Sequence, residues 1–123
     1  MCLILSELVE NVPVAAATHL AACRPVSPPP RALAVAQDRL AEKDFISALS
    51  VAVAPYLSID DGEHIPDDAD SLLPGILKPR RLGYDGKGQA PVSTRDELVA
   101  ACRRMSGVPM IVEQKIDFAF EVS

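Results

Sequence analysis

The sequence predicts an α+β protein in which short strands pair around two helices. Several short apolar runs are bounded by Gly, Pro or acidic residues, which is typical of strands. Two longer segments repeat apolar residues at helical spacing. The chain has 123 residues, 49% of them hydrophobic, which is enough to bury a core. We find no internal repeat and no apolar run near the ~18–20 residues of a membrane span.

Charge and cysteine usage exclude several functional classes. With 12 basic and 17 acidic side chains, the net charge of −5 argues against a general nucleic-acid binder. Three widely spaced cysteines form neither a CxxC pair nor a disulfide framework, which indicates a reducing compartment. His19 and His64 lack neighbours at zinc-ligand spacing. The start of the chain lacks the features of a signal peptide, so we expect a cytoplasmic protein with no membrane partner.

The N-terminal part is expected to contain one strand and one helix. Residues 2–5 predict a short buried strand, and Asn11 predicts the N-cap of a helix over 14–23. Four prolines fall within residues 24–30, so this stretch is expected to be an extended connector. We therefore expect a remnant of an α/β domain over 1–23, a linker over 24–30 and a second domain over 31–123.

Residues 32–49 predict a helix with a bend near Asp38. Its apolar positions share one face, and they are Ala41, Phe45, Ala48 and Leu49. The charged positions between them face water. A strand is expected over 54–59, followed by an acidic segment over 60–70 that we interpret as a solvated loop. A calcium loop is the alternative, but the required ligand spacing is absent.

The remaining elements follow from turn, cap and periodicity signals. A strand over 75–78 enters a loop that extends to residue 89, and another strand is expected to follow it. Ser93 or Thr94 then caps a helix, with Glu97 completing a capping box. That helix is expected to end at Gly107. Its one apolar face consists of Leu98, Ala101, Cys102 and Met105. Two further strands are expected over 110–114 and 118–122.

One loop is basic and rich in glycine although the chain is acidic. Over residues 78–89 it holds four cations and three glycines: Lys78, Arg80, Arg81 and Lys87, with Gly83, Gly86 and Gly88. Glycines let backbone amides approach an anion, and lysines supply point charges to phosphate oxygens. A polyphosphate cover and a solvated hairpin turn both fit this composition. The loop lacks the GxxxxGK[ST] pattern of a P-loop.

The residue identities in this loop are more specific than its composition. The run Gly83-Tyr-Asp-Gly-Lys-Gly-Gln89, together with Asp38-Arg-Leu-Ala-Glu-Lys43 and Glu10-Asn-Val-Pro13, resembles the 5-(carboxyamino)imidazole ribonucleotide synthase family. Ile76-Leu-Lys78 and the segment from Ile111 to Ser123 also resemble that family, in the same order. The family belongs to the ATP-grasp enzymes. The resemblance implies an ATP-grasp lid subdomain preceded by the tail of an α/β N-terminal domain.

The resemblance also implies a reaction. In that family ATP phosphorylates bicarbonate to carboxyphosphate, and the carboxyl group passes to aminoimidazole ribonucleotide in de novo purine biosynthesis. Catalysis then consists of positioning and charge neutralisation around the transferring phosphoryl group. ATP, bicarbonate and aminoimidazole ribonucleotide are the implied partners, magnesium is the implied metal, and the complete enzyme is a possible homodimer. Another ATP-grasp ligase and a non-catalytic nucleotide-binding module remain as alternatives.

The resemblance assigns roles to particular residues. Arg39 and Lys78 would lie nearest the nucleotide phosphates, and Glu121 would accept from the ribose hydroxyls. The adenine edge would meet a segment acting mainly through its backbone: Glu113, Gln114, Lys115 and Ile116. The loop closing over the phosphates would consist of Gly83, Tyr84, Asp85, Gly86, Lys87, Gly88 and Gln89.

Structural explanations compete with these roles. Arg39 could be a helix-surface cation, Lys78 could simply end a strand, and the two glutamates could point outward from strands. The role of Glu7 and Glu10 stays open because the chain departs from the family pattern there. The magnesium ligands of the family are expected beyond residue 123. We therefore expect the chain to be a fragment that lacks activity alone.

Overall fold

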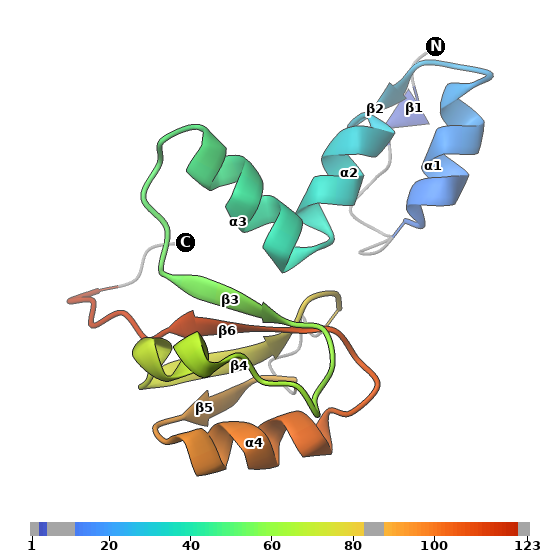
Figure 1. The fold of residues 1–123 in the computed structure, drawn as a ribbon. Helices are drawn as coiled ribbons and strands as arrows, with labels where there is room; N and C mark the ends of the chain where they lie inside the picture. Colours follow the sequence, from blue (N-terminus) through green and yellow to red (C-terminus); the bar gives the residue numbers. More distant parts are fainter. Residues whose placement is uncertain (1–2, 5–11, 83–87, 121–123) are drawn as a thin grey trace. The chain divides into compact units, whose positions relative to one another are not determined.

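The computed structural model describes residues 3–4, 12–82 and 88–120. The chain forms two compact units, residues 1–50 and 51–123, whose positions relative to one another are not determined (Figure 1). No helix in the described ranges is long and apolar enough to span a membrane.

The first unit contains α1 (Val14–Ala21), α2 (Pro30–Ala36) and α3 (Arg39–Ala48), and a two-residue parallel pair of β1 (Leu3–Ile4) with β2 (Val26–Ser27). The predicted helix over 14–23 is confirmed up to Ala21, whereas the predicted cap Asn11 lies outside the described residues. The α1 helix packs against α2, and α2 against α3. Gln37 also donates its side-chain Nε2 to the carbonyl of Val12 at 2.8 Å.

In the Pro-rich stretch, residues 26–27 form β2 and Pro29 is extended, as predicted, whereas Pro30 already belongs to a helix. This strand pairs with β1, and α2 begins directly at Pro30, where proline fits the first turn. The expected linker over 24–30 thus lies inside the first compact unit, as do residues 31–50. The division into a domain remnant over 1–23, a linker over 24–30 and a second domain over 31–123 stays a prediction.

The bend predicted near Asp38 is confirmed as a break between two helices. Asp38 is 5% exposed, and its Oδ1 accepts from the amides of Leu40 at 3.1 Å and Ala41 at 3.4 Å. This capping satisfies amides that have no partner within the helix, so α3 restarts there. The apolar positions expected to share one face of this helix do not form a buried face, because Phe45 and Leu49 are exposed.

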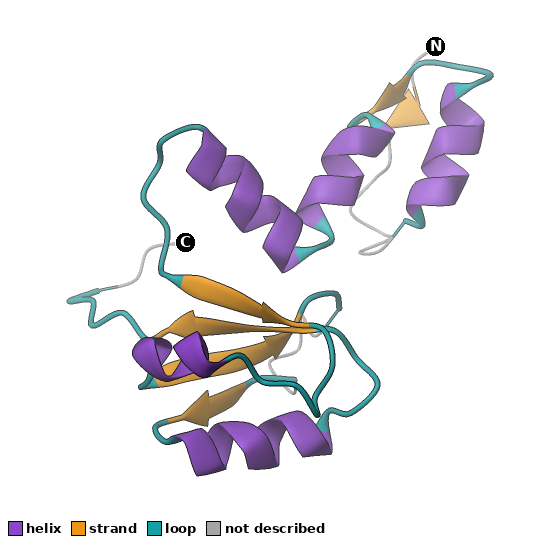
Figure 2. Cartoon of the chain, viewed as in Figure 1, coloured by secondary structure: helices purple, strands orange, loops and turns teal. Residues whose placement is uncertain are grey.

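The second unit is an antiparallel sheet of four strands in the order β3-β6-β4-β5 (Figure 2). These strands are β3 (Tyr56–Ile59), β4 (Gly75–Pro79), β5 (Ala90–Val92) and β6 (Met110–Gln114). The 3₁₀ helix η1 (Asp67–Leu72) and the helix α4 (Arg95–Arg104) complete the unit. The strands predicted near 54–59, 75–78 and 110–114 are confirmed, as is the strand after the glycine loop.

One face of the sheet carries the core. Residues opposite one another in the register point to the same face, which aligns Leu77 with Val112 and Leu57. Leu98, Ala101 and Cys102 of α4 join this cluster, and Met105 packs against it partly buried. The predicted apolar face of the helix is therefore confirmed. The cluster also includes Ala69 and Leu72 of η1, which places both helices on the core side of the sheet.

Two predictions in this unit need correction. The acidic segment over 60–70 is not a loop throughout, because its last four residues enter η1, where Ala69 and Leu72 provide apolar anchors. The strand predicted over 118–122 is absent from residues 118–120, and the rest of that range is not described. Phe118 and Phe120 are exposed and pair with no strand in the described part of the chain.

The capping prediction for α4 is confirmed. Thr94 is the N-cap, and its Oγ1 accepts from the amide of Glu97 at 3.3 Å. The Glu97 carboxylate in turn accepts from the amide of Ser93 at 2.7 Å, one residue before the cap. After the helix, Gly107 has a φ of +82°, a conformation that favours glycine.

Candidate functional site

The sheet face opposite the core carries polar side chains together with two isoleucines, of which Ile111 is fully buried. The antiparallel register places Ile76, Glu113 and Tyr56 in one row across β4, β6 and β3. The next row contains Lys78, Ile111 and Ser58. Because side chains alternate between the faces of a sheet, all six lie on the face that does not hold the α4 core. We call these two rows the polar face.

Lys78 and Glu113 form an ion pair on the polar face. They are diagonal neighbours on adjacent strands, and Lys78 Nζ lies 3.2 Å from Glu113 Oε2. Only 20% of the lysine side chain and 12% of the glutamate side chain are exposed. Because both side chains have lost most of their contact with water, the attraction between their charges is screened less than it would be on an exposed surface. Thus β4 and β6 fix a cation at a partly buried position.

A second set of polar contacts, among Ser58, Asp60 and Arg80, lies next to the polar face. Asp60 Oδ1 accepts from Ser58 Oγ at 2.8 Å and lies 3.3 Å from Arg80 NH1. The amide of Arg80 also donates to the carbonyl of Pro109 at 2.9 Å. These contacts anchor the residue that follows β4. The sequence analysis placed Arg80 in the glycine-loop motif but did not select it or Asp60 as site residues, since their pairing joins segments 20 residues apart.

The other predicted site residues are only partly brought together. Gly88 is partly buried and Gln89 exposed, immediately before β5, whereas residues 83–87 and Glu121 lie outside the described ranges. Arg39 is the first residue of α3 in the first unit, so its distance from the polar face is not determined.

The predicted adenine segment starts on β6 and continues beyond it. Gln114 is opposite Gly75, so alternation directs its side chain to the other face from Glu113. The amide of Gln114 donates to Pro55 at 2.8 Å, and that of Lys115 donates to Pro74 at 2.9 Å. Both amides are therefore occupied by backbone carbonyls. The exposed Ile116 follows them, after the end of the strand.

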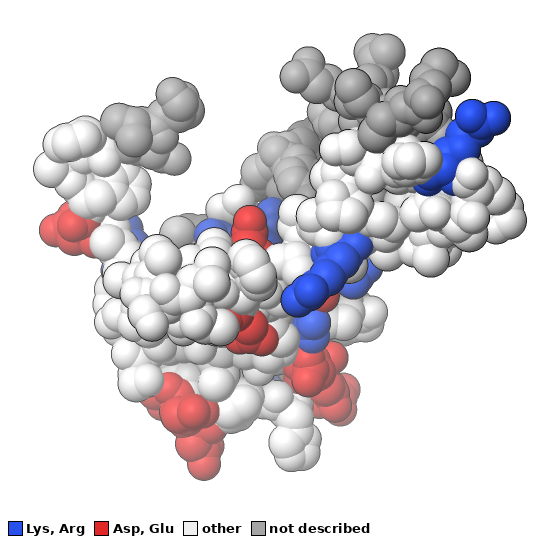
Figure 3. Space-filling model, turned by 90° about the horizontal axis from the view of Figure 1, so that it is seen from above, with Lys and Arg blue, Asp and Glu red and all other residues white. Residues whose placement is uncertain are grey.

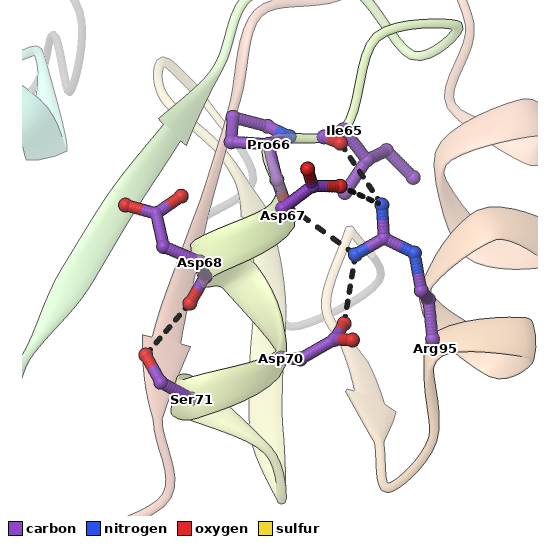
Figure 4. A network of polar contacts seen from close by, with 7 residues as sticks. All are labelled: Ile65, Pro66, Asp67, Asp68, Asp70, Ser71 and Arg95. Atoms are coloured by element: carbon purple, nitrogen blue, oxygen red, sulfur yellow. Dashed lines mark hydrogen bonds and ion pairs between the residues drawn. The ribbon is translucent and has the colours of Figure 1, made fainter.

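The acidic segment is held by an arginine on α4. Arg95 donates to Asp70 at 2.8 Å and to the carbonyl of Ile65 at 3.1 Å, and also approaches Pro66 O and Asp67 (Figure 4). The hydrogen bond to Asp70 raises the pKa of Arg95 above its ordinary value, so the charge of Arg95 persists. In Figure 4 the Asp68 carboxylate points away from Arg95.

These contacts do not form a metal site. Within residues 3–4, 12–82 and 88–120, no three His, Cys, Asp or Glu side chains come together to hold a metal ion. The carboxylates of Asp67 and Asp70 are directed to Arg95 rather than to a common centre (Figure 4). The described residues thus do not fit the magnesium that the resemblance implies, and they do not support the calcium-loop alternative.

Two further observations bear on the chemistry of the chain. Burial raises the pKa of the Cys102 thiol, which keeps this core residue protonated and unreactive. On the side drawn in Figure 3, the charged side chains of the described residues lie in several small groups of either sign.

Comparison with known proteins identifies the fold and its relatives. The ATP-grasp domain family matches residues 44–123. A N5-carboxyaminoimidazole ribonucleotide synthase of Brucella melitensis is 44% identical over 118 residues, and these cover 93% of this chain and 32% of that protein. A bifunctional purine synthesis protein of Dictyostelium discoideum is 32% identical over 93% of this chain and 12% of its own length.

A solved structure extends this similarity to three dimensions. The crystal structure of N5-carboxyaminoimidazole ribonucleotide synthetase from Thermus thermophilus superposes with a TM-score of 0.82 at 37% identity. The superposition covers 96% of this chain and 31% of that one, so the chain spans about a third of the length of these synthases. The α+β fold and the family resemblance predicted from the sequence are confirmed, and the chain belongs to the ATP-grasp domain family.

Proposed function

We propose that this chain provides part of the ATP-binding region of an N5-carboxyaminoimidazole ribonucleotide synthase. The complete enzyme would use ATP to phosphorylate bicarbonate and would pass the carboxyl group of carboxyphosphate to the amine of aminoimidazole ribonucleotide. The products would be the carboxyamino ribonucleotide, ADP and phosphate. The choice of these substrates rests on the family resemblance. The observation that supports ATP binding most directly is the partly buried Lys78 on a polar sheet face, at the start of the glycine loop.

Lys78 is proposed to contact the phosphates. Its ammonium has three donors, of which the bond to Glu113 uses one, so further donors are available to phosphate oxygens. The loop over 83–89 would contribute backbone amides and the charge of Lys87. Arg39, the first residue of α3, is proposed as a second phosphate cation, as the resemblance implies.

The adenine and ribose are proposed to lie along the end of β6. The amides of Gln114 and Lys115 are already donated within the sheet, so we place the amide contact with adenine at Ile116. The backbone carbonyls of the segment 113–116 would accept from the adenine amino group. Glu121 would accept from the two ribose hydroxyls, as the sequence analysis predicts.

No step of phosphoryl transfer is assigned to the described residues. Magnesium, where an ATP-grasp enzyme holds it, neutralises charge on the β- and γ-phosphates. A second candidate is that these 123 residues bind nucleotide without turning it over. Bicarbonate, the acceptor amine and a homodimer would then concern the complete enzyme.

Calorimetry and an ADP-release assay test this proposal together. We expect weak ATP binding that Lys78→Ala reduces, because the substitution removes the proposed contact with the phosphates. Lys43→Ala on α3 is the matched lysine control and should leave ATP affinity unchanged. ATP affinity that is equal in the wild-type chain and in Lys78→Ala would contradict the proposed site. Bicarbonate-dependent ADP release by the chain alone would contradict the assignment of binding without turnover.

A further inference from the structure

The carboxylate of Glu113 is more than a neighbour of the predicted adenine segment. It is 12% exposed, and it lies across the β4–β6 ladder from Lys78, with its Oε2 3.2 Å from the lysine Nζ. The two residues are separated by 35 positions in sequence, so only the strand register brings them together. The resemblance assigns the segment 113–116 a role mainly through backbone groups and names no separate role for the side chain of Glu113.

We propose that Glu113 is a positioning residue that holds the Lys78 ammonium in place for the nucleotide phosphates. This inference rests on the proposed ATP binding and adds a role for a second side chain. A free lysine side chain on a strand samples many rotamers and loses that freedom when it binds a ligand. The bond to Glu113 restricts Lys78 before ligand arrives, so less ordering is required at the moment of binding.

The geometry favours positioning over competition. A single carboxylate contact leaves donors on the ammonium, so a phosphate oxygen can join without displacing Glu113. The two β-strands on which the residues lie are paired over five positions, which makes the supporting backbone rigid. If competition or repulsion by the Glu113 charge dominated instead, removing the carboxylate would tighten ATP binding.

A double-mutant cycle on ATP affinity tests this role in the 123-residue chain. We expect Glu113→Ala to weaken ATP binding about tenfold and Glu113→Gln about threefold, because the amide oxygen retains an acceptor. In a Lys78→Ala background, Glu113→Ala should change the ATP affinity by less than about twofold, because the lysine it positions is gone. Adenosine affinity should stay the same in every variant, since adenosine has no phosphate.

Glu63 provides the matched control. It is an exposed glutamate on the loop before η1, beside α4 rather than on the polar face. Glu63→Ala and Glu63→Gln should bind ATP as the wild-type chain does. The backbone amide spectrum of α4 reports whether each variant is folded.

The Lys78 ammonium itself gives a second readout that does not depend on ligand. In the wild-type chain its side-chain ¹⁵Nζ signal should be visible through slow hydrogen exchange, and Glu113→Ala should broaden it beyond detection while the α4 spectrum is unchanged. Retention of that signal in Glu113→Ala would overturn the inference, as would tighter ATP binding by that variant. A loss of ATP affinity from Glu113→Ala that is as large in the Lys78→Ala background as in the wild-type chain would also overturn it. Failure of the wild-type chain to bind ATP would refute the proposed function, and with it this role. ATP binding that Lys78→Ala weakens and Glu113→Ala does not would refute this role alone.

Discussion

The two compact units bury very different amounts of apolar surface. Among the described residues of the first unit, only Ala17 and Asp38 are buried, whereas the sheet unit encloses a cluster built from four strands, η1 and α4. Phe45 and Leu49 of α3 are exposed on the surface. Burial of apolar side chains is the main favourable term in folding. The sheet unit therefore has its own source of stability, and it is also the unit that carries the polar face.

Removing a core side chain should produce the largest effect in this comparison. Leu98→Ala takes away a leucine with 0% exposure and should destabilise the sheet unit by about 2–5 kcal/mol. Leu49→Ala, at 61% exposure, should change stability by no more than about 0.5 kcal/mol. Denaturant unfolding followed by the amide signals of each unit measures both values. Equal losses for the two substitutions would show that the exposed face of α3 is buried in solution.

A smaller effect is expected from the glycine that opens β4. A Cβ on Gly75 would lie 2.8 Å from the carbonyl oxygens of both Glu113 and Leu72. Because backbone cannot move as easily as a side-chain end, Gly75→Ala should cost roughly 1–3 kcal/mol. Thermal unfolding of this variant gives the cost directly.

Gly107 is the comparison for Gly75. Nothing lies within 4 Å of a Cβ built on it, but its φ of +82° disfavours other residues. Gly107→Ala should therefore cost about 1 kcal/mol through backbone strain alone. If Gly107→Ala lowered the stability more than Gly75→Ala, the close packing of Gly75 against β6 and η1 would contribute less to stability than the backbone conformation at Gly107.

Effects of about the same size as that of Gly107→Ala are expected at the helix caps, one in each unit. Asp38→Ala removes an acceptor for two amides of α3, and Thr94→Ala removes one for an amide of α4. Each should destabilise its own unit by about 1 kcal/mol. Hydrogen exchange should show faster opening of α3 alone in the first variant and of α4 alone in the second. Opening of both helices in either variant would indicate that the two units unfold as one.

Local signals in the sequence predicted most of the individual elements. The spacing of Leu98, Ala101 and Cys102 identified the buried face of α4, and Thr94 with Glu97 identified its start. These features depend on neighbours within a few residues, so periodicity and capping chemistry describe them well. The exposed Phe45 shows the limit of this approach, because periodicity does not tell whether a partner covers the face.

Contacts between distant segments could not be predicted in this way. The loop composition and the resemblance selected Lys78, but its partner Glu113 became apparent only from the register of β4 with β6. The pairing of Arg95 with Asp67 and Asp70 likewise joins α4 to a segment 25 to 28 residues earlier. The acidic segment therefore looked like a solvated loop in the sequence, whereas the structure uses two of its carboxylates to hold η1 against α4.

The central claim is that nucleotide binds on the polar face of the sheet unit. Mapping the amide chemical shifts of the ¹⁵N-labelled chain during an ATP titration tests it most directly. The account predicts that the shifts concentrate at Lys78 on β4 and over residues 111–116, while Leu98, Ala101 and Cys102 of α4 are little affected. Shifts confined to residues 12–50, or centred on α4, would contradict it.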